Sequence, residues 1–227
     1  MLRTKTYLFV SVAAALLATS LSACASKSSK AQAGAQPGGA TDVVCIYKTG
    51  GPPARNVGKP LSGASTVAAY TATLNTSQGT VTLKLNAAKA PCTVNSFVFL
   101  AGKKYFDGTT CHRLTTAGIF VLQCGDPTAT GSGGPGYQFA DENLKGAAYP
   151  AGTVAMANAG PGTNGSQFFL VYKDTTLGPH YTPFGTIGSG LDVIAKIAAA
   201  GSDESNGPGD GKPKLPANIS HLTIATK

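Results

Sequence analysis

One arginine, several amides and several aromatic side chains are concentrated in residues 111–169 of this chain. They fall in Cys111-His112-Arg113-Leu114, in Phe120-Val121-Leu122-Gln123, and in the run from Met156 to Phe169. The short apolar stretches alternate as strands do. A guanidinium stays charged and offers its N–H donors in a rigid fork. The set therefore predicts a site that holds its ligand with fixed donors beside an apolar pocket, without proton transfer.

The composition indicates one globular domain with low-complexity extensions. Of 227 residues, 42% are hydrophobic and 12% charged, and 29 are glycine and 14 proline. Many turn-forming residues among short apolar runs favour a β-rich fold over a helical bundle. The formal net charge is +8, but the basic residues are scattered, which argues against nucleic acid as a partner. The glycine-rich run 131–136 lacks the Lys-Ser/Thr ending of a phosphate loop, so we interpret it as a loop beside the groove.

Residues 1–23 are typical of a lipoprotein signal peptide. Arg3 and Lys5 precede an apolar stretch, which ends with Leu21-Ser22-Ala23-Cys24. The stretch is short and rich in Ser, Thr and Ala, so a retained transmembrane helix is the less favoured alternative. The ending resembles a bacterial lipobox, which implies a lipid on Cys24 and an anchor at the outer face of the cell membrane. Without Arg3 and Lys5 the net charge is +6, which favours contact with anionic headgroups or wall polymers.

Two segments separate this signal from the domain. Residues 24–40 predict a flexible tether, because Ser, Lys, Gln, Gly and Ala offer nothing to bury. Residues 41–66 predict an extended arm that clasps the domain: Val43–Tyr47 could pack as a strand, whereas the glycines and prolines that follow prevent regular structure. The domain itself is predicted to span residues 67–227.

The domain is predicted to open with a β-hairpin and to contain two helices. Strands 69–74 and 80–85 are joined by residues 75–79, where glycine supplies the positive φ. Residues 90–102 have proline near the start, apolar residues at helical spacing and glycine at the end. Residues 191–200 form the second predicted helix, with Val193, Ile194 and Ile197 as its buried stripe.

Several motifs follow one another in the order of a known family. They are Asn95-Ser96-Phe97, Phe106-Asp107-Gly108-Thr109, His112-Arg113, Phe120 to Gln123, Gly125-Asp126, Gly131 to Tyr137, Met156 to Phe169 and Phe184-Gly185. Over about residues 67–227 the chain resembles a cyclophilin-type peptidyl-prolyl cis-trans isomerase. With the lipobox and the Cys45 arm, it resembles the lipid-anchored extracytoplasmic cyclophilins of actinobacteria. The resemblance implies an all-β-dominated fold, an eight-stranded antiparallel β-barrel capped by two helices, with no metal or other cofactor.

The resemblance also implies a role for each site residue. Rotation about an X-Pro bond is opposed by amide resonance, a barrier of about 18–20 kcal/mol, and a catalyst needs only to hold the twisted amide better than the planar one. Arg113 would donate to the prolyl nitrogen, and Gln123 would hold Arg113 or the substrate carbonyl. The residues implied to bind the substrate are Phe120, Val121, Phe169, Leu177 and Tyr181 around the proline, and Ala157, Asn158 and Gln167 along the peptide. Alternation along a strand puts Phe168 in the core and Phe169 on the opposite face. A structural Arg113, paired with a carboxylate, is the alternative.

The chain departs from the family pattern at four places. Two residues are inserted within 114–119, which predicts a longer or bulged turn. Cys111 replaces the customary Phe or Val, and Tyr181, beside His180, falls where the family has its pocket histidine. Thr176 stands where cyclosporin-sensitive members have tryptophan, and the chain has none, so we predict weak cyclosporin binding.

The cysteines fit an oxidising compartment. With Cys24 lipidated, four remain, and three pairings are possible. The hairpin brings Cys111 nearly opposite Cys124, so we predict this pair, which leaves Cys45 and Cys92 to tie the arm down. Four free buried thiols are the alternative. A zinc site that includes His112 is less favoured, because no CxxC spacing occurs.

The predicted function is that of a monomeric peptidyl-prolyl isomerase acting on exported proline-containing polypeptides. One alternative is a noncatalytic module that holds proline-containing segments as a chaperone or scaffold. A second is a cell-envelope adhesin that uses the arm at 41–66 as its working surface.

Overall fold

The computed structural model describes residues 42–226. The predicted signal peptide, the lipidation of Cys24 and the tether lie outside these residues. The helices are α1 (Pro91–Gly102) and α2 (Leu191–Ala199). The strands are β1 (Asp42–Val44), β2 (Lys48–Thr49), β3 (Gly63–Ser65), β4 (Ala69–Thr76), β5 (Gly79–Asn86), β6 (Thr109–Thr110), β7 (Arg113–Thr115), β8 (Val121–Cys124), β9 (Tyr137–Gln138), β10 (Thr153–Met156), β11 (Phe168–Val171), β12 (Pro183–Ser189), β13 (Asp210–Gly211) and β14 (Asn218–Thr226).

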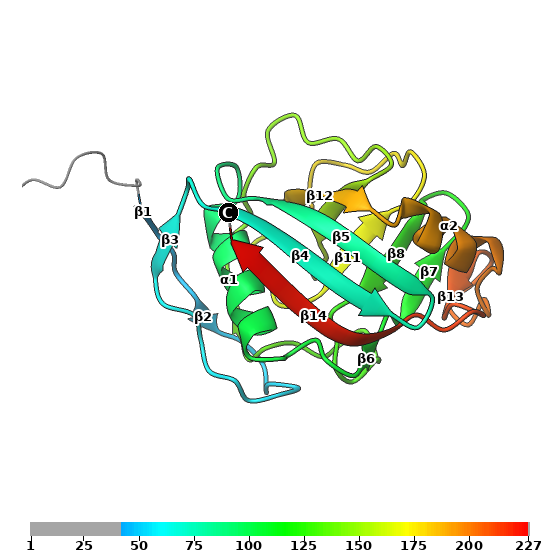
Figure 1. Ribbon diagram of the computed structural model, residues 1–227, viewed down its shortest axis with the longest axis horizontal. Helices are drawn as coiled ribbons and strands as arrows, with labels where there is room; N and C mark the ends of the chain where they lie inside the picture. The colour runs from blue at the N-terminus through cyan, green and yellow to red at the C-terminus, as the bar shows by residue number, and fades with distance from the viewer. Residues whose placement is uncertain (1–41, 227) are drawn as a thin grey trace, which may run out of the picture. The chain divides into compact units, whose positions relative to one another are not determined.

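The main sheet of the described chain has ten antiparallel strands in the order β13-β7-β8-β11-β10-β12-β5-β4-β14-β6. Only Cys111 and His112 separate β6 from β7, and β6 pairs with β14 while β7 pairs with β8. The segment 109–115 therefore closes the sheet into a barrel. The predicted fold class is confirmed. The strand number differs from eight because segment 109–115 is interrupted and because the short β13 adds to the edge. Figure 1 shows α1 and α2 at opposite ends of β4 and β5.

The first hairpin is longer than predicted. β4 and β5 pair from Ala69 with Asn86 through to Thr76 with Gly79, so only Ser77 and Gln78 form the turn. Polar residues at the end of β4 remain in the strand because β14 pairs with them on the other side. The Thr76 hydroxyl closes the turn, since it donates to the Gly79 carbonyl at 2.7 Å and accepts from the Gln78 N–H at 3.1 Å.

Both predicted helices are present. On α1, Phe97 packs with ring centroids 5.1 Å from Phe106 and 5.3 Å from Phe168, which joins the helix to the barrel core. On α2, Ile194 and Ile197 are buried while Val193 is only half-buried, and the helix ends one residue earlier than predicted. No helix within residues 42–226 is both long enough and apolar enough to span a membrane.

Residues 42–66, which we call the arm, are attached to the rest of the described chain by a short strand pair, a disulfide and several hydrogen bonds. β1 pairs with β3 inside the arm, and β2 pairs with β9. The strand suggested at 43–47 ends at Val44, which is exposed, as is all of β1. A disulfide joins Cys45 to Cys92 on α1, and the Tyr47 hydroxyl donates to the Cys92 carbonyl at 2.8 Å. The arm thus lies beside α1, as Figure 1 shows.

Both disulfides join the cysteines that the sequence paired. Cys111 and Cys124 are bonded across the β6–β8 region, with their Cα atoms 3.9 Å apart, and Cys45 is bonded to Cys92. The alternative of four free thiols is wrong. The Cys111–Cys124 bond lies next to the point where the barrel closes, so it holds the strands that carry Arg113 and Gln123.

Candidate active site

Strands β8, β10 and β11 carry two separate sets of apolar side chains. Alternate residues such as Leu122, Met156 and Phe168 point into the barrel core. The residues between them face the other way, as period-two alternation requires. There they form an apolar cluster of Val121, Tyr149, Ala155, Phe169 and Val171, with Ile119, Ala147, Ala157, Leu177 and Tyr181 packed at its edge. The predicted separation of Phe168 from Phe169 is confirmed.

The strand register puts the polar and apolar parts of the site in one row. Arg113 lies opposite Gln123, Gln123 opposite Phe169, and Phe169 opposite Ala155, across β7, β8, β11 and β10. Directly opposed residues share one face of a sheet, and neighbouring strands lie about 4.8 Å apart. Backbone pairing alone therefore places Arg113 two strands away from Phe169 of the apolar cluster. We call these four opposed residues the Arg113 row.

Arg113 is held by a carboxylate and an amide. Its Nε donates to Oδ1 of Asp210 at 2.8 Å, Nη2 donates to Oδ2 at 2.6 Å, and Nη1 donates to Oε1 of Gln123 at 3.3 Å. The carboxylate pairing considered as the alternative is thus present. A guanidinium has five N–H groups, so two have no acceptor within residues 42–226 and are available to a ligand.

The same contacts keep both charges fixed. The hydrogen bond from Arg113 lowers the pKa of Asp210, and the hydrogen bond to Asp210 raises the pKa of Arg113. Burial lowers the pKa of His112, the residue before Arg113, so this ring is neutral at neutral pH. Arg113 is therefore the cation of this row throughout the neutral range.

Gln123 continues the polar chain away from Arg113. Its Nε2 donates to Oε1 of Gln167 at 2.8 Å, and Nε2 of Gln167 donates to the carbonyls of Gly131 and Gly133 at 2.9 and 3.0 Å. The loop that carries these carbonyls is fastened to the buried Asp126, whose carboxylate accepts the N–H groups of Gly131 and Gly133. Because both of its ends are anchored, the chain fixes which way each amide points.

An aromatic wall borders the apolar cluster. The ring of Tyr181 meets Phe169 edge to face, with centroids 5.6 Å apart, and Tyr149 lies 6.2 Å from Phe169. The hydroxyl of Tyr149 donates to the Tyr181 carbonyl at 2.8 Å and accepts its N–H at 3.1 Å. Burial raises the pKa of Tyr149, so this phenol stays neutral and can make both bonds. Sequence reasoning missed Tyr149, since nothing in its neighbourhood marks it.

Ala157 and Asn158 lie just past the end of β10. The Ala157 N–H donates to the Gln167 carbonyl at 3.0 Å. The side chain of Asn158 donates to the His180 carbonyl at 2.7 Å and accepts the Gly160 N–H at 3.2 Å. This amide is therefore used to hold the segment that carries Tyr181.

A side cavity of about 410 Å³ borders these residues. Gln123, Ala157, Asn158 and Gln167 line it together with the glycine-rich loop 131–136. Gly51 and Pro52 of the arm also line it. The glycine-rich loop thus lies beside the predicted site residues, and the arm contributes to the same lining.

Phe120 does not join the apolar cluster. Its ring packs edge to face on Tyr172 at 6.1 Å, and Nζ of Lys173 lies 4.5 Å from its centroid, while Ile119 stands at the cluster edge instead. The inserted residues explain this arrangement. After β7 the chain leaves the ladder, and the Val121 N–H donates to the Thr115 hydroxyl at 3.1 Å rather than to a backbone carbonyl.

Sequence reasoning also missed Asp210. It lies on β13, which pairs with β7, and the Thr116 N–H in the inserted turn donates to the Gly209 carbonyl at 2.7 Å. The longer turn and the Gly209–Gly211 segment are thus packed together beside Arg113. A carboxylate 97 residues from its partner leaves no spacing signal, and only Gly-Asp-Gly in a turn-rich stretch marks it.

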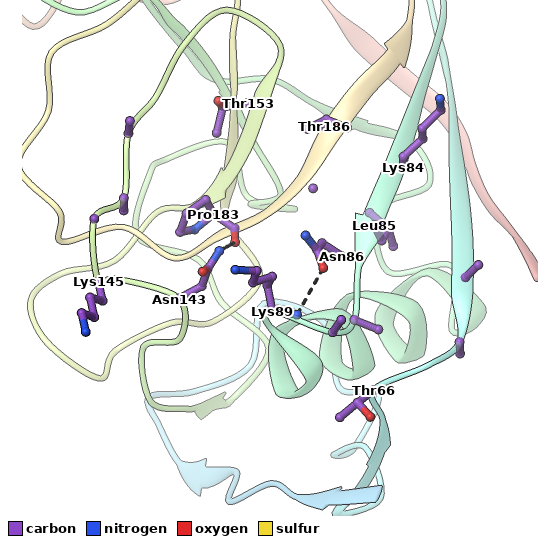
Figure 2. A pocket seen from close by; sticks show the side chains of 18 of the residues that line it. Thr66, Lys84, Leu85, Asn86, Lys89, Asn143, Lys145, Thr153, Pro183 and Thr186 are labelled. Atoms are coloured by element: carbon purple, nitrogen blue, oxygen red, sulfur yellow. Dashed lines mark hydrogen bonds between the residues drawn. The ribbon is translucent and has the colours of Figure 1, made fainter. Parts of the chain in front are cut away.

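A larger cavity of about 680 Å³ lies elsewhere and includes none of the predicted site residues. Figure 2 shows Lys84, Lys89 and Lys145 around it on three segments, and the side chain of Asn143, which also lines it, donates to the Pro183 carbonyl at 3.0 Å. Over residues 42–226, no group of three or more His, Cys, Asp or Glu side chains is placed to hold a metal ion. We therefore place the candidate active site at the Arg113 row rather than in this larger cavity.

Comparison with known proteins agrees with this geometry. A family model described as cyclophilin type peptidyl-prolyl cis-trans isomerase/CLD matches residues 71–224. A Mycobacterium tuberculosis protein named probable peptidyl-prolyl cis-trans isomerase B is 51% identical over 163 residues, 66% of this chain and 52% of that protein. The peptidyl-prolyl cis-trans isomerase A of the same species is 38% identical over 178 residues, 71% of this chain and 95% of that protein.

Solved structures give the same answer. A cyclophilin-type isomerase from Cryptosporidium parvum has a TM-score of 0.62 and 28% identity, with coverage of 70% of this chain and 99% of the other. The closed antiparallel sheet with its two helices, together with these matches, defines a cyclophilin fold. The chain belongs to the cyclophilin-type peptidyl-prolyl cis-trans isomerase family. It spans about half the length of the B-type relatives it matches.

Proposed function

We propose that this protein is a peptidyl-prolyl cis-trans isomerase that accelerates rotation about X-Pro bonds in polypeptides outside the cytoplasm. One observation carries the proposal: two N–H donors of a fixed guanidinium remain available in the same cross-strand row as an apolar cluster. Membership of the family supports it. A second crystal structure of the C. parvum relative was obtained in the presence of the dipeptide Ala-Pro, which supports a proline-containing ligand here as well.

The proposed mechanism needs no proton transfer. The apolar cluster around Phe169 would take the proline ring, and Ala157 and Asn158 would hold the adjoining chain. As the amide twists, its nitrogen loses conjugation and becomes an acceptor, which the free donors of Arg113 would stabilise. Asp210 and Gln123 fix the guanidinium, so little reorganisation is required when the twisted state forms. Phe120, placed against Tyr172, would act outside the pocket.

The direct test compares the purified full chain, disulfides intact, with Arg113→Ala in an exchange assay on a short X-Pro peptide. We expect kcat/KM to fall by at least about tenfold, or about 1.4 kcal/mol of transition-state stabilisation. Lys196→Ala, which removes a positive charge from the exposed side of α2, is the matched control and should be unchanged. Equal activity of the wild type and Arg113→Ala would refute the arginine mechanism.

A noncatalytic module that holds proline-containing segments is the second candidate. The bidentate pairing of Arg113 with Asp210 favours this noncatalytic function, because two N–H donors of the guanidinium are already bound to the carboxylate. A folded wild-type chain that binds the peptide without accelerating exchange would establish this alternative. The same peptide therefore decides between the two functions.

We also propose that the protein is a lipoprotein anchored through Cys24 at the outer face of the cell membrane. The lipobox-like Leu21–Cys24 supports the anchor, and the two disulfides support an oxidising compartment. Replacing Cys24 with Ser should move the protein from the membrane fraction to the soluble fraction in its native host. An unchanged membrane fraction would contradict lipidation at this residue.

Weak cyclosporin binding remains a prediction. Thr176 is exposed and adjoins Leu177, which packs at the edge of the apolar cluster. Threonine there offers neither the ring area nor the N–H donor of the tryptophan it replaces.

A further inference from the structure

The arm forms part of the wall of the side cavity next to the Arg113 row. Gly51 and Pro52 line this cavity together with Gln123 and Gln167, which belong to the hydrogen-bonded chain that ends on Arg113. The cavity of about 410 Å³ lies within the range of about 300–1,000 Å³ that is usual for ligand clefts. Any polypeptide that extends from the apolar cluster into this cavity would meet the arm.

Backbone contacts hold this stretch of the arm against the glycine-rich loop. The Gly50 N–H donates to the Gly136 carbonyl at 3.0 Å, and the Ala54 N–H donates to the Gly134 carbonyl at 2.8 Å. Between these bonds, Pro53 packs so closely on Gly136 that a Cβ at position 136 would lie 3.0 Å from the proline ring. Pro52 is therefore held at the rim by its neighbours rather than by its own side chain, which is exposed.

The chemistry of the side cavity points to an uncharged occupant. None of the residues that line it, all of them within the described part of the chain, is Asp, Glu, Lys, Arg or His. Glycine, proline, alanine, serine, threonine and amide side chains dominate the wall. A charged group placed there would lose hydration without gaining an opposite charge.

We propose that the arm is a specificity-determining part of the substrate-binding surface, with Pro52 forming the wall that selects uncharged residues flanking the isomerised proline. This inference rests on the proposed function, since it assigns the side cavity to the chain that adjoins the proline. It differs from use of the arm as an adhesive surface. The arm acts here on the substrate of the Arg113 row.

The test places a charge of either sign at position 52 and asks whether the preference for charged peptides changes accordingly. Purified full-length Pro52→Glu and Pro52→Lys are assayed for kcat/KM on peptides with Glu, Lys or Ala two residues before or two residues after proline. We expect Pro52→Glu to favour the Lys peptide over the Glu peptide by about two- to fivefold relative to wild type, and Pro52→Lys to do the opposite, as weak exposed charge pairs would produce. The effect should appear at one of the two peptide positions. The Ala peptide is the uncharged reference for each protein. An Ala-Pro dipeptide derivative is too short to reach the arm, so it should react alike with all three proteins.

Leu61→Glu and Leu61→Lys are the matched controls. Leu61 is on the same arm and 86% exposed, but it does not line the side cavity, so these variants carry the same net charge without facing the substrate. Selectivities in the Pro52 variants that equal those of the Leu61 variants would overturn the proposal, while wild-type turnover of the dipeptide derivative would leave the isomerase function intact. If no peptide is turned over by wild type, the same comparison of dissociation constants, measured by calorimetry, tests the arm independently of catalysis.

Discussion

At the scale of single residues, the site depends on how Asp210 presents Arg113. The carboxylate takes the side of the guanidinium formed by Nε and Nη2, and Gln123 takes one donor of Nη1, so the fork cannot rotate freely. The cation is thereby oriented before any ligand arrives. It is not simply a positive charge near the pocket.

The pH profile of the proposed activity should be flat from about pH 6.5 to 9, since no group of the row titrates in that range. Arg113 has a raised pKa, and His112 has a lowered pKa and stays neutral down to below its ordinary 6.5. Asp210 has a pKa below its ordinary 3.8, so the stability it contributes is fully present above pH 3.8 and is lost as pH falls through the lower folded value. A change in activity near pH 6.5, measured with a peptide that does not titrate, would contradict the prediction that His112 stays neutral there.

Asp210 itself should act as a positioning residue. Asp210→Asn keeps one acceptor oxygen but turns an N–H₂ group toward Arg113, so we expect kcat/KM to fall about three- to tenfold with little change in the unfolding temperature. Asp210→Glu, which restores the carboxylate, should recover part of the loss. Were Asp210→Asn as active as wild type, the guanidinium would be oriented by Gln123 alone.

At the scale of elements, α1 begins without a capping side chain of its own. Ala90 is the residue before the helix, and the first turn contains no acidic residue. Glu142, from the loop after β9, supplies the missing acceptors: its carboxylate accepts the Cys92 N–H at 3.1 Å, the Thr93 N–H at 2.8 Å and the Thr93 hydroxyl at 2.7 Å. The helix start therefore depends on a distant segment.

Glu142→Ala should lower the free energy of unfolding by about 1–2 kcal/mol, because the buried Thr93 hydroxyl and two helix N–H groups lose their acceptor. This corresponds to about 2–8 °C in thermal unfolding followed by circular dichroism. Glu142→Gln, which keeps one oxygen, should lose less. Equal losses for the two variants would show that charge, rather than the acceptors, stabilises this end.

Elements with a local signal were predictable, and elements defined by partners were not. The β4–β5 hairpin and both helices followed from periodicity and from Pro91 and Gly102, whereas the extension of β4 to Thr76 depends on pairing with β14 at the far end of the chain. The Arg113–Gln123 pair and the Phe168–Phe169 alternation were likewise readable, since each lies on adjacent or single strands. Asp210, Tyr149 and the displacement of Phe120 by the inserted turn arise from tertiary packing, which no spacing in the sequence encodes.

At the scale of the described chain, the two disulfides close loops of different length. Cys45 and Cys92 are 47 residues apart, and Cys111 and Cys124 are 13 apart. In the chain-entropy account, a longer loop restricts the unfolded chain more. The bond that attaches the arm is therefore expected to stabilise the fold more than the bond inside the barrel.

The double variant Cys45→Ser/Cys92→Ser should lower the free energy of unfolding by about 4 kcal/mol, against about 3 kcal/mol for Cys111→Ser/Cys124→Ser. Urea unfolding of both variants, without reductant, measures the difference. The opposite order would mean that the Cys111–Cys124 bond stabilises the native barrel directly, through the strands beside Arg113.

The closure of the barrel has a consequence for when the proposed active site can be complete. Arg113 lies in the segment 109–115, which must pair with β14 on one side, while Asp210 beside it comes from β13. Both partners lie within residues 210–226, which are made or threaded after the rest of the described chain, so an emerging chain can fold its first hairpin and α1 and still hold no oriented guanidinium. The site would be complete only once β13 and β14 have arrived, so detection of the proposed activity would indicate that the whole described domain has emerged and folded.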